Sequence, residues 1–397
     1  MRPPNLQNLK EELDSSFDPE TRTKLTQSGF DATRLVSLAA SLAGGDANTR
    51  RSRRNRIAGA VEPPSEDEIR PIPPPGSGER QRLEALGLEA LRRGELAFAV
   101  LAGGMATRMG SVVKALVEVA DGHTFLDLRL RENRLWSERA GRPVPLWLMT
   151  SEATDAPTRD ALERTGAPAH VRTFTQDLGL RLTPEGRLFF GDDGKPSLYS
   201  PGHGDLVDAL RRSGLLRAFL AQGGRYVWIA NLDNLGATID PCLLGLFIEV
   251  QRESERAGAR IDVMVEVTDK EAGDRGGIPV HALGKLQILE EFRLPSDFDA
   301  SAVRVFNTNT FLVSAAALET VNIEWNWFEV EKQVEGRPAI QFERLLQELT
   351  GAMPAAYVRV PRHGPSARFL PVKDRDELEA RRGAIASVVR SRGILPE

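Results

Sequence analysis

The stretch Leu96-Ala97-Phe98-Ala99-Val100-Leu101-Ala102-Gly103-Gly104 is an uninterrupted apolar run that ends in two adjacent glycines. Its residues 96–101 predict a strand buried on both faces, as in a parallel sheet covered by helices. Glycine adopts positive φ at no steric cost, so the pair predicts a sharp turn where the strand ends. We therefore expect an α/β fold with a loop whose backbone can approach a ligand closely.

Further apolar runs alternate with helical patterns along the rest of the chain. The predicted strands are 144–149, 170–175, 226–230, 261–268 and 305–313, and the predicted helices are 124–139, 154–165, 205–221 and 241–257. This alternation is typical of an α/β sheet with helices on both faces. Ligands of such sheets bind at the carboxyl ends of the strands, which is where the polar motifs of this chain fall.

The chain divides by composition into four segments. We predict a helical N-terminal segment at 1–61, a Pro-rich linker at 62–78, the main domain at 79–375 and a C-terminal helical tail at 376–397. Five arginines lie from Arg50 to Arg56, and they form an anion site, a solvated face or a mobile segment.

The bulk composition excludes several classes of function. The chain has 52 basic and 56 acidic residues, for a net charge of −4, so no basic field favours nucleic acid as a partner. No apolar run is long enough to span a membrane. The single cysteine, Cys242, and the polar N-terminus favour a cytoplasmic protein. The oligomeric state stays open.

The glycine loop runs from Leu101 to Gly110 and is followed by Lys114. Its backbone N–H groups could hold a phosphate, with Arg108 and Lys114 supplying positive charge. The loop matches neither the Walker pattern nor the dinucleotide fingerprint. A simple strand-to-helix turn explains the glycines equally well.

Two further polar motifs flank predicted strands. Ser200-Pro201-Gly202-His203-Gly204-Asp205 opens a helix, and its glycines expose backbone beside His203, which is otherwise read as a structural histidine. Asn231-Leu232-Asp233-Asn234-Leu235-Gly236 follows a strand, and Asp233 is either a Mg2+ ligand or part of an Asx turn.

Weaker signals lie downstream, at Glu266, Gly277, Asn307, Asn309 and Lys373. Amide side chains such as Asn307 and Asn309 are suited to binding sugar hydroxyls. The chain contains no G-x-S-x-G, H-E-x-x-H or CxxC pattern, so triad hydrolysis and zinc catalysis fit poorly.

Together the motifs resemble the UTP–glucose-1-phosphate uridylyltransferases and the related UDP-N-acetylhexosamine pyrophosphorylases. The resemblance covers about residues 85–375 in order. Its blocks are GLEALRRGELAFAVLAGGMATRMG, PLWLMTS, FTQ, SPGHGDLVDALRRSGLL, NLDNLGATID, VEVTDK, DRGG, LGKLQILE, FNTNTFLV and RFLPVKD. It implies a GT-A-like, Rossmann-related mixed sheet, and the chain has no room for the family's C-terminal β-helix.

The resemblance also implies roles for matching residues. The nucleotide would contact Leu101, Gly103, Gly104, Gln176, Gly202 and His203, with the Gln176 amide reading uracil. The sugar would lie against Asn231, Asn234, Glu266, Gly277, Asn307 and Asn309. Asp233 would hold Mg2+, while Lys373, Arg108 and Lys114 would act in catalysis.

The implied reaction joins a nucleoside triphosphate to a sugar 1-phosphate, first of all UTP to glucose 1-phosphate. Ala106, the short run before Lys114, Ile278 and Thr310 depart from the family pattern. They leave open another sugar or cyclitol phosphate, or a purine nucleotide. A non-catalytic nucleotide-sugar sensor is the remaining alternative, although retention of Asp233 and Lys373 together speaks against it.

Overall fold

The computed structural model describes residues 6–15, 17–43, 46–106, 109–110 and 112–396. Its centre is an eight-stranded sheet in the order β2-β19-β13-β16-β12-β3-β8-β9. The strands are β2 (Ile69–Pro71), β19 (Ala355–Arg359), β13 (Val263–Asp269), β16 (Val305–Ser314), β12 (Tyr226–Asn231), β3 (Leu96–Leu101), β8 (Leu146–Thr150) and β9 (Val171–Thr175). Only β16 runs antiparallel to its neighbours, so the sheet is mixed, as predicted.

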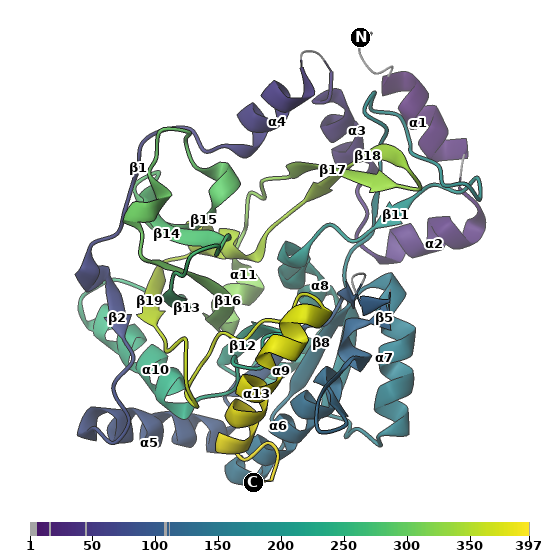
Figure 1. Ribbon diagram of the computed structural model, residues 1–397. Coiled ribbons are helices and arrows are strands. Elements are labelled where there is room, and N and C mark those ends of the chain that lie inside the picture. Colours follow the sequence, from purple (N-terminus) through teal and green to yellow (C-terminus); the bar gives the residue numbers. More distant parts are fainter. Residues whose placement is uncertain (1–5, 16, 44–45, 107–108, 111, 397) are drawn as a thin grey trace.

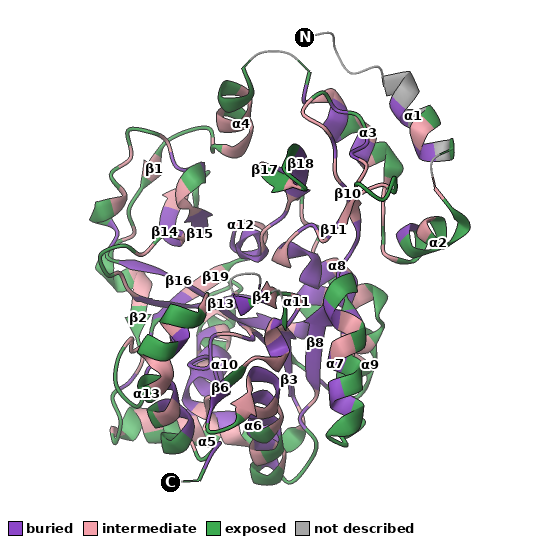
Figure 2. Cartoon of the chain, turned by 45° about the vertical axis from the view of Figure 1, so that its right-hand side comes forward, coloured by how far each residue is buried: buried purple, intermediate pink, exposed green. Residues whose placement is uncertain are grey.

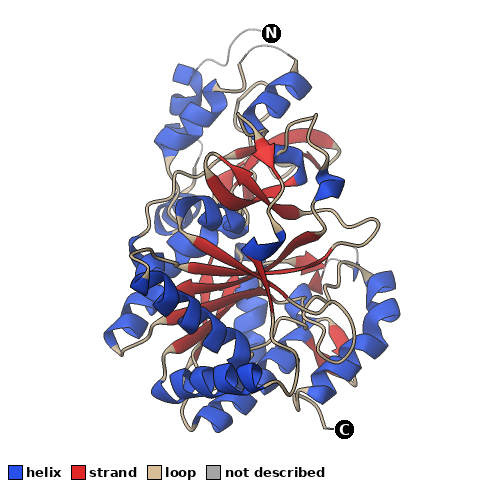
Figure 3. Cartoon of the chain, turned by 90° about the vertical axis from the view of Figure 1, so that its left-hand side faces the viewer, coloured by secondary structure: helices blue, strands red, loops and turns tan. Residues whose placement is uncertain are grey.

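Helices cover both faces of this sheet (Figure 3). Alternate residues of β3 point to opposite faces, so Phe98 and Val100 join one apolar cluster while Ala97 and Ala99 join another. The first cluster includes residues of α5 (Gly78–Arg93), α6 (Phe125–Ala140), α7 (Glu152–Arg164), α10 (Pro241–Arg256) and α13 (Arg375–Ser391). The second includes residues of α8 (Leu206–Arg212), α9 (Leu215–Ala221) and α11 (Ala315–Thr320). Figure 2 shows the central strands buried between these layers.

The helix predicted at 205–221 is interrupted. The short 3-10 turn His203–Asp205 precedes α8, and Ser213 and Gly214 separate α8 from α9. Gly214 has a φ of 75°. A left-handed residue ends an α-helix, which the apolar periodicity alone did not reveal.

The N-terminal residues form four helices, α1 (Leu6–Ser15), α2 (Pro19–Gln27), α3 (Ala32–Ala40) and α4 (Ala47–Asn55). They lie beside the hairpin of β17 (Phe328–Val334) and β18 (Arg337–Glu343), at the opposite end of the molecule from α5 and α6 (Figure 1). A third apolar cluster joins α1, α2 and α3 to β10 (Gly179–Leu180) and β18.

The arginine run was interpreted as an anion site, a solvated face or a mobile segment, and the structure shows another role for three of its arginines. Arg50 and Arg51 form ion pairs with Glu329 and Glu331 on β17, and Arg54 donates to the carbonyl of Trp327. These arginines attach α4 to the hairpin.

Residues 62–78 do not form a free linker. β1 (Val61–Glu62) pairs with β14 (Gly277–Ala282), which in turn pairs with β15 (Lys285–Glu290), and β2 is an edge strand of the main sheet. Proline is tolerated at such edges, which explains how a Pro-rich stretch takes part in a sheet.

α13 joins the first apolar cluster through Ile385 and Val389, while Val388, also buried, packs with Ala367 and Leu370. Within the part of the chain that the structure describes, no helix has the length and hydropathy needed to cross a membrane.

Candidate functional site

The predicted site residues follow strands that end side by side. In the sheet register Leu101 of β3 lies opposite Asn231 of β12 and Met149 of β8, and Thr150 lies opposite Thr175 of β9. These four strands are parallel, so the loops that begin after them leave from one edge of the sheet. The topology therefore brings together the glycine loop, Gln176 and the Asn231–Gly236 turn.

The glycine loop folds back on itself as a hairpin. β4 (Met105–Ala106) pairs with β5 (Val112–Val113), and the Lys114 N–H donates to the Gly104 carbonyl at 3.2 Å. Lys114 therefore returns to the start of the loop. Arg108 lies outside the described residues, so its predicted role stays a prediction.

Gln176 is the meeting point of the predicted nucleotide contacts. A Cβ on Gly103 would lie 2.5 Å from the Gln176 Oε1 atom, so a larger residue there would force the Gln176 side chain to move. The Gln176 Nε2 donates to the Gly202 carbonyl at 2.9 Å, and its backbone N–H donates to Thr150 at 2.8 Å. Its amide nitrogen is thus bound within the chain, while Oε1 faces the glycine loop.

Gly202 and His203 are held by the chain segment after β18. Gly202 has a φ of 97°, and a Cβ there would lie 2.7 Å from the Arg344 carbonyl oxygen. The Leu346 N–H donates to His203 Nδ1 at 2.9 Å, which leaves the ring proton on Nε2. Burial lowers the pKa of His203 to about 4. Near neutral pH, His203 is therefore a neutral donor.

Lys114 and Asp233 form an ion pair at the edge of the sheet. Their side chains are 15% and 19% exposed, so the pair is accessible from solvent. Two residues predicted to act on phosphates, one through its charge and one through a metal, are in direct contact. To bind a phosphate or a metal, Lys114 and Asp233 would each have to give up the other as a partner.

The turn that carries Asp233 is fixed by α6. Arg129, which is buried, donates to the carbonyls of Asn231, Asn234 and Ala237 at 3.1, 2.6 and 2.9 Å. Glu132 pairs with Arg129 and accepts from the Ile239 N–H at 2.8 Å. The sequence analysis missed both residues. Their signal was a charged pair at core positions of an amphipathic helix, among Phe125, Leu126 and Trp136.

Asn234, which was predicted to contact the sugar, is largely occupied by contacts within the chain, and its sugar contact stays a prediction. It is fully buried, its Nδ2 donates to the Arg368 carbonyl at 3.1 Å, and its Oδ1 accepts from Leu370 at 2.8 Å and Gly236 at 3.2 Å. Three of the four hydrogen-bonding positions of the amide are thus used by the surrounding loops, which leaves one N–H of Nδ2.

Glu266 is also buried, and both of its oxygens accept from Arg368, at 2.5 and 2.7 Å. It supports the floor of the site in this arrangement, and its contact with a sugar stays a prediction.

The remaining predicted sugar contacts form one patch across three strands. Asn309 Nδ2 donates to Asn231 Oδ1 at 2.8 Å, and the Asn309 N–H donates to Asn307 Oδ1 at 2.9 Å. A Cβ on Gly277 would lie 3.7 Å from the Asn307 Cβ. Asn309 has a φ of 57°, beside a register shift between β13 and β16. Its Oδ1 is buried and has no hydrogen-bond partner among the described residues, so it can accept from a ligand.

Lys373 lies in the loop before α13, with an exposed side chain. Its N–H donates to Glu377 Oε2 at 2.8 Å. Among the described contacts, none joins its side chain to the Lys114–Asp233 pair. Its catalytic role stays a prediction.

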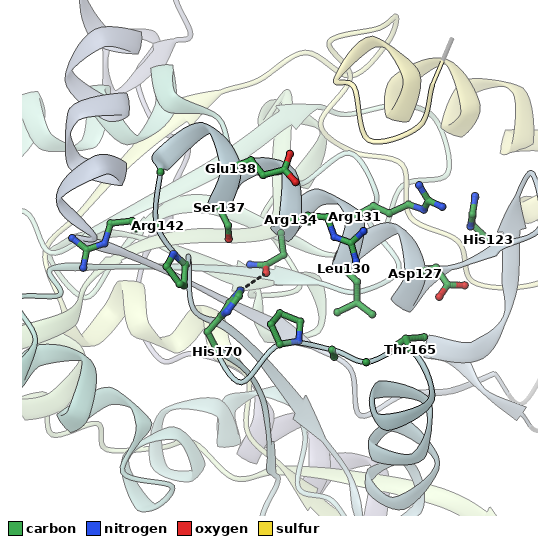
Figure 4. A pocket seen from close by; sticks show the side chains of 16 residues that line it. His123, Asp127, Leu130, Arg131, Arg134, Ser137, Glu138, Arg142, Thr165 and His170 are labelled. Atoms are coloured by element: carbon green, nitrogen blue, oxygen red, sulfur yellow. Dashed lines mark hydrogen bonds between the residues drawn. The ribbon is translucent and has the colours of Figure 1, made fainter.

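A cavity of about 780 Å³ lies elsewhere, between α6 and the 165–170 loop (Figure 4). His170 Nε2 donates to Asn133 Oδ1 at 3.0 Å in its wall, since the Asn133 amide nitrogen is bound to the Val144 carbonyl. None of the predicted site residues lines this cavity. Its size alone does not make it the substrate site.

Comparison with known proteins agrees with the geometry. Residues 53–389 match the model of the family described as UTP–glucose-1-phosphate uridylyltransferase. The enzyme of that name from Musa acuminata is 34% identical over 314 residues, 73% of this chain and 63% of its own length. The Hordeum vulgare enzyme is 33% identical over 300 residues, 70% of this chain and 59% of its own length. The chain thus spans about 60% of the length of these relatives.

The solved structures agree in fold. The UDP-glucose phosphorylase from Trypanosoma brucei superposes with a TM-score of 0.71 and 23% identity, over 91% of this chain and 77% of that one. This likeness confirms the mixed sheet flanked by helices.

Proposed function

The chain belongs to the UTP–glucose-1-phosphate uridylyltransferase family, and we propose that it transfers a nucleotidyl group from a nucleoside triphosphate to a sugar 1-phosphate. The first choice of substrates is UTP and glucose 1-phosphate, as in the names of its relatives. An oxygen of the sugar phosphate attacks the α-phosphorus. The bond between the α-phosphorus and the bridging oxygen breaks, and pyrophosphate leaves. A phosphate dianion is itself a nucleophile, so no protein base is required.

One observation carries this proposal: the Lys114–Asp233 pair lies where the two predicted halves of the site meet. Asp233 shares the turn after β12 with Asn231, which binds Asn309 of the sugar patch. The Lys114 N–H is hydrogen-bonded to the Gly104 carbonyl, beside Gly103 and Gln176, which were predicted to contact the nucleotide. A phosphate chain that joins nucleotide to sugar would cross this pair, which is the geometry that in-line transfer needs.

The nucleotide would lie over Gly103 and Gly104, with its base near Gln176. Because Gln176 Oε1 is the atom that faces the glycine loop, it can accept the imide N–H of uracil. The His203 Nε2–H supplies a neutral donor for an ester or phosphate oxygen. These contacts stabilise the bound substrate and orient its α-phosphorus.

The donor set near Asp233 fits Mg2+ in part. No group of three or more His, Cys, Asp or Glu side chains suited to a metal occurs in the described part of the chain. Mg2+ is commonly bound through one or two carboxylates, with waters and substrate phosphates completing its shell, so Asp233 alone is sufficient on the protein side. When bound, the metal would neutralise charge on the phosphates. Lys114 would then release Asp233 and become free to bind a phosphate oxygen.

The test is pyrophosphate release, measured with Mg2+ over four nucleoside triphosphates and several sugar 1-phosphates. We expect the fastest release with UTP and glucose 1-phosphate. Faster release with another pair would change the assigned substrates and leave the reaction type unchanged. Absence of release for every pair, with a folded protein that still binds UDP-glucose, would overturn catalysis and favour a nucleotide-sugar sensor.

A further inference from the structure

Arg344 lies at the end of β18 and is the centre of a buried charge network. It is 2% exposed. Its guanidinium donates to Asp205 through Nε at 2.6 Å, to Asp177 through Nη2 at 2.7 Å and to Asp208 through Nη1 at 2.5 Å. A single side chain thus satisfies three carboxylates from two different segments of the chain.

These carboxylates belong to the segments proposed to hold the nucleotide. Asp177 follows Gln176 directly, while Asp205 ends the turn that begins at His203. Asp205 also accepts from the Asp177 N–H at 3.0 Å, so the two segments touch. The planar fork of an arginine fixes its partners in both distance and direction. Arg344 therefore sets how far Gln176 lies from Gly202 and His203.

The backbone around Arg344 makes the same connection. The Arg344 N–H donates to the Pro201 carbonyl at 2.8 Å, and the Arg344 carbonyl accepts from Gly204 at 3.0 Å. Two residues later the Leu346 N–H binds His203 Nδ1. The position of the 200–205 loop is thus tied to the chain at Arg344 through both backbone and side chain.

The N-terminal helices cover this network from outside. The guanidinium of Arg344 lies 5.3 Å from the ring centre of Trp325 and 5.0 Å from that of Trp327. Arg34 of α3 lies over the Trp327 ring at 5.0 Å, and Arg54 of α4 binds the Trp327 carbonyl at 2.8 Å. Asp177 and Asp205 are buried, and their low exposure to water strengthens their ionic hydrogen bonds to Arg344.

We propose that Arg344 is a positioning residue for the nucleotide, which holds Gln176 and the Gly202–His203 turn at the separation that a bound nucleotide requires. This inference rests on the proposed function. Arg344 itself does not touch the substrate. It acts through the Gln176 Nε2 hydrogen bond to Gly202, which spans the two segments that the arginine joins.

A lysine at this position would keep the charge and lose the fork. Its single ammonium cannot reach three carboxylates in fixed directions. We expect Arg344→Lys to raise the KM for UTP by about 10-fold to 100-fold, the scale of a misplaced binding group. The KM for the sugar phosphate and kcat at saturating UTP should change by less than about threefold, since the Asp233 turn is held by Arg129 instead. A purely structural loss would lower the amount of active enzyme and leave the KM for UTP unchanged.

Arg293→Lys is the matched control. Arg293 is also buried and pairs with a carboxylate, Glu348, but it contacts neither segment of the nucleotide site. Its KM for UTP should equal that of the wild type. Should Arg344→Lys fail to fold, Asp208→Asn removes one partner of the fork at a position whose side chain is 35% exposed. That variant should raise the KM for UTP several-fold.

Calorimetric titration of the wild type with UTP separates the two proposals. If the wild type does not bind UTP, the proposed function and the positioning role fall together. If it binds UTP, and Arg344→Lys and Asp208→Asn bind it equally well with unchanged KM, only the role of Arg344 is overturned. Weaker UTP binding in these variants, with Arg293→Lys unchanged, supports it.

Discussion

Two buried arginines hold the two loops of the site, and their partners differ. Arg129 binds three backbone carbonyls and one carboxylate, Glu132, around the Asp233 turn. Arg344 binds three carboxylates around the nucleotide segments. The Asp233 side is therefore held mainly by neutral acceptors, whereas the nucleotide side depends on balanced charge. We infer that the first is a rigid platform for the reaction and the second is sensitive to charge and pH.

The largest expected effect is the loss of stability when the fork of Arg344 is removed. Arg344→Met should lower the free energy of unfolding by about 3–5 kcal/mol, because buried carboxylates lose their partner. Arg129→Met should cost less, since it affects one buried carboxylate, Glu132, rather than two, Asp177 and Asp205. Urea unfolding of both variants measures which one loses more free energy of unfolding. Equal losses would contradict the contrast between the two sides of the site.

The next effect is on turnover at the Asp233 side. Asp233→Asn should lower kcat on the order of 10²- to 10³-fold by weakening charge neutralisation at the phosphates. Its KM for UTP should change far less, in contrast with Arg344→Lys. Steady-state kinetics with both substrates varied separates the two constants. A variant with normal kcat would place the reaction away from this turn.

Lys373→Ala should also reduce kcat on the order of 10²-fold, if the side chain reaches a phosphate as the family resemblance implies. The exposed side chain predicts an unchanged melting temperature. Near-normal activity in a folded variant would remove Lys373 from the mechanism.

The contrast also predicts a pH dependence on the nucleotide side. Burial raises the pKa of Asp205 from 3.8, so its contribution to stability is present below about pH 4 and is lost as the pH rises through the raised pKa. His203 has the opposite sign. Its pKa is lowered from 6.5 to about 4, so its contribution is present above pH 6.5 and is lost as the pH falls through 4.

The two contributions oppose each other between about pH 4 and pH 6.5, each with a slope near 1.4 kcal/mol per pH unit. Relative to wild type, Asp205→Asn should become more stable as the pH rises in this range, and His203→Gln less stable. Urea unfolding at several pH values measures both. Parallel curves for all three proteins would show that neither group titrates differently on folding.

The smallest expected effect lies in the sugar patch. Asn309→Gly keeps the left-handed backbone but removes an amide whose Oδ1 is free to accept from a ligand. Loss of one hydrogen bond of about 1 kcal/mol should raise the KM for the sugar phosphate several-fold. An unchanged KM would place the sugar elsewhere, and a change in the KM for UTP instead would assign Asn309 to the nucleotide.

The strands and the order of the motifs were predictable from the sequence because they depend on local periodicity. β3 was predicted to the residue, and Gly103 and Asp233 were singled out through short motifs that follow strands, whereas Gln176 was singled out through the family resemblance. The partners that hold these motifs were not predictable. Arg129, Arg344 and Arg368 act across separations of roughly one hundred residues or more, which no local pattern encodes.

The same reason explains two features that the sequence did not reveal. Asn234 belongs to a family motif, yet its burial depends on contact with Arg368 and Leu370, far along the chain. Three residues of the Pro-rich segment, Ile69–Pro71, form an edge strand because β19 offers them a partner. In both cases tertiary contact decided what composition left open.

The most direct test of the central claim follows the α-phosphorus. UTP labelled with ³²P at that atom is mixed with glucose 1-phosphate, Mg2+ and excess enzyme in a single turnover. The account predicts that the label moves into UDP-glucose while unlabelled pyrophosphate is released, and that Asp233→Asn slows this transfer on the order of 10²-fold or more. Label that stays in UTP, or that appears as free UMP, would contradict nucleotidyl transfer at this site.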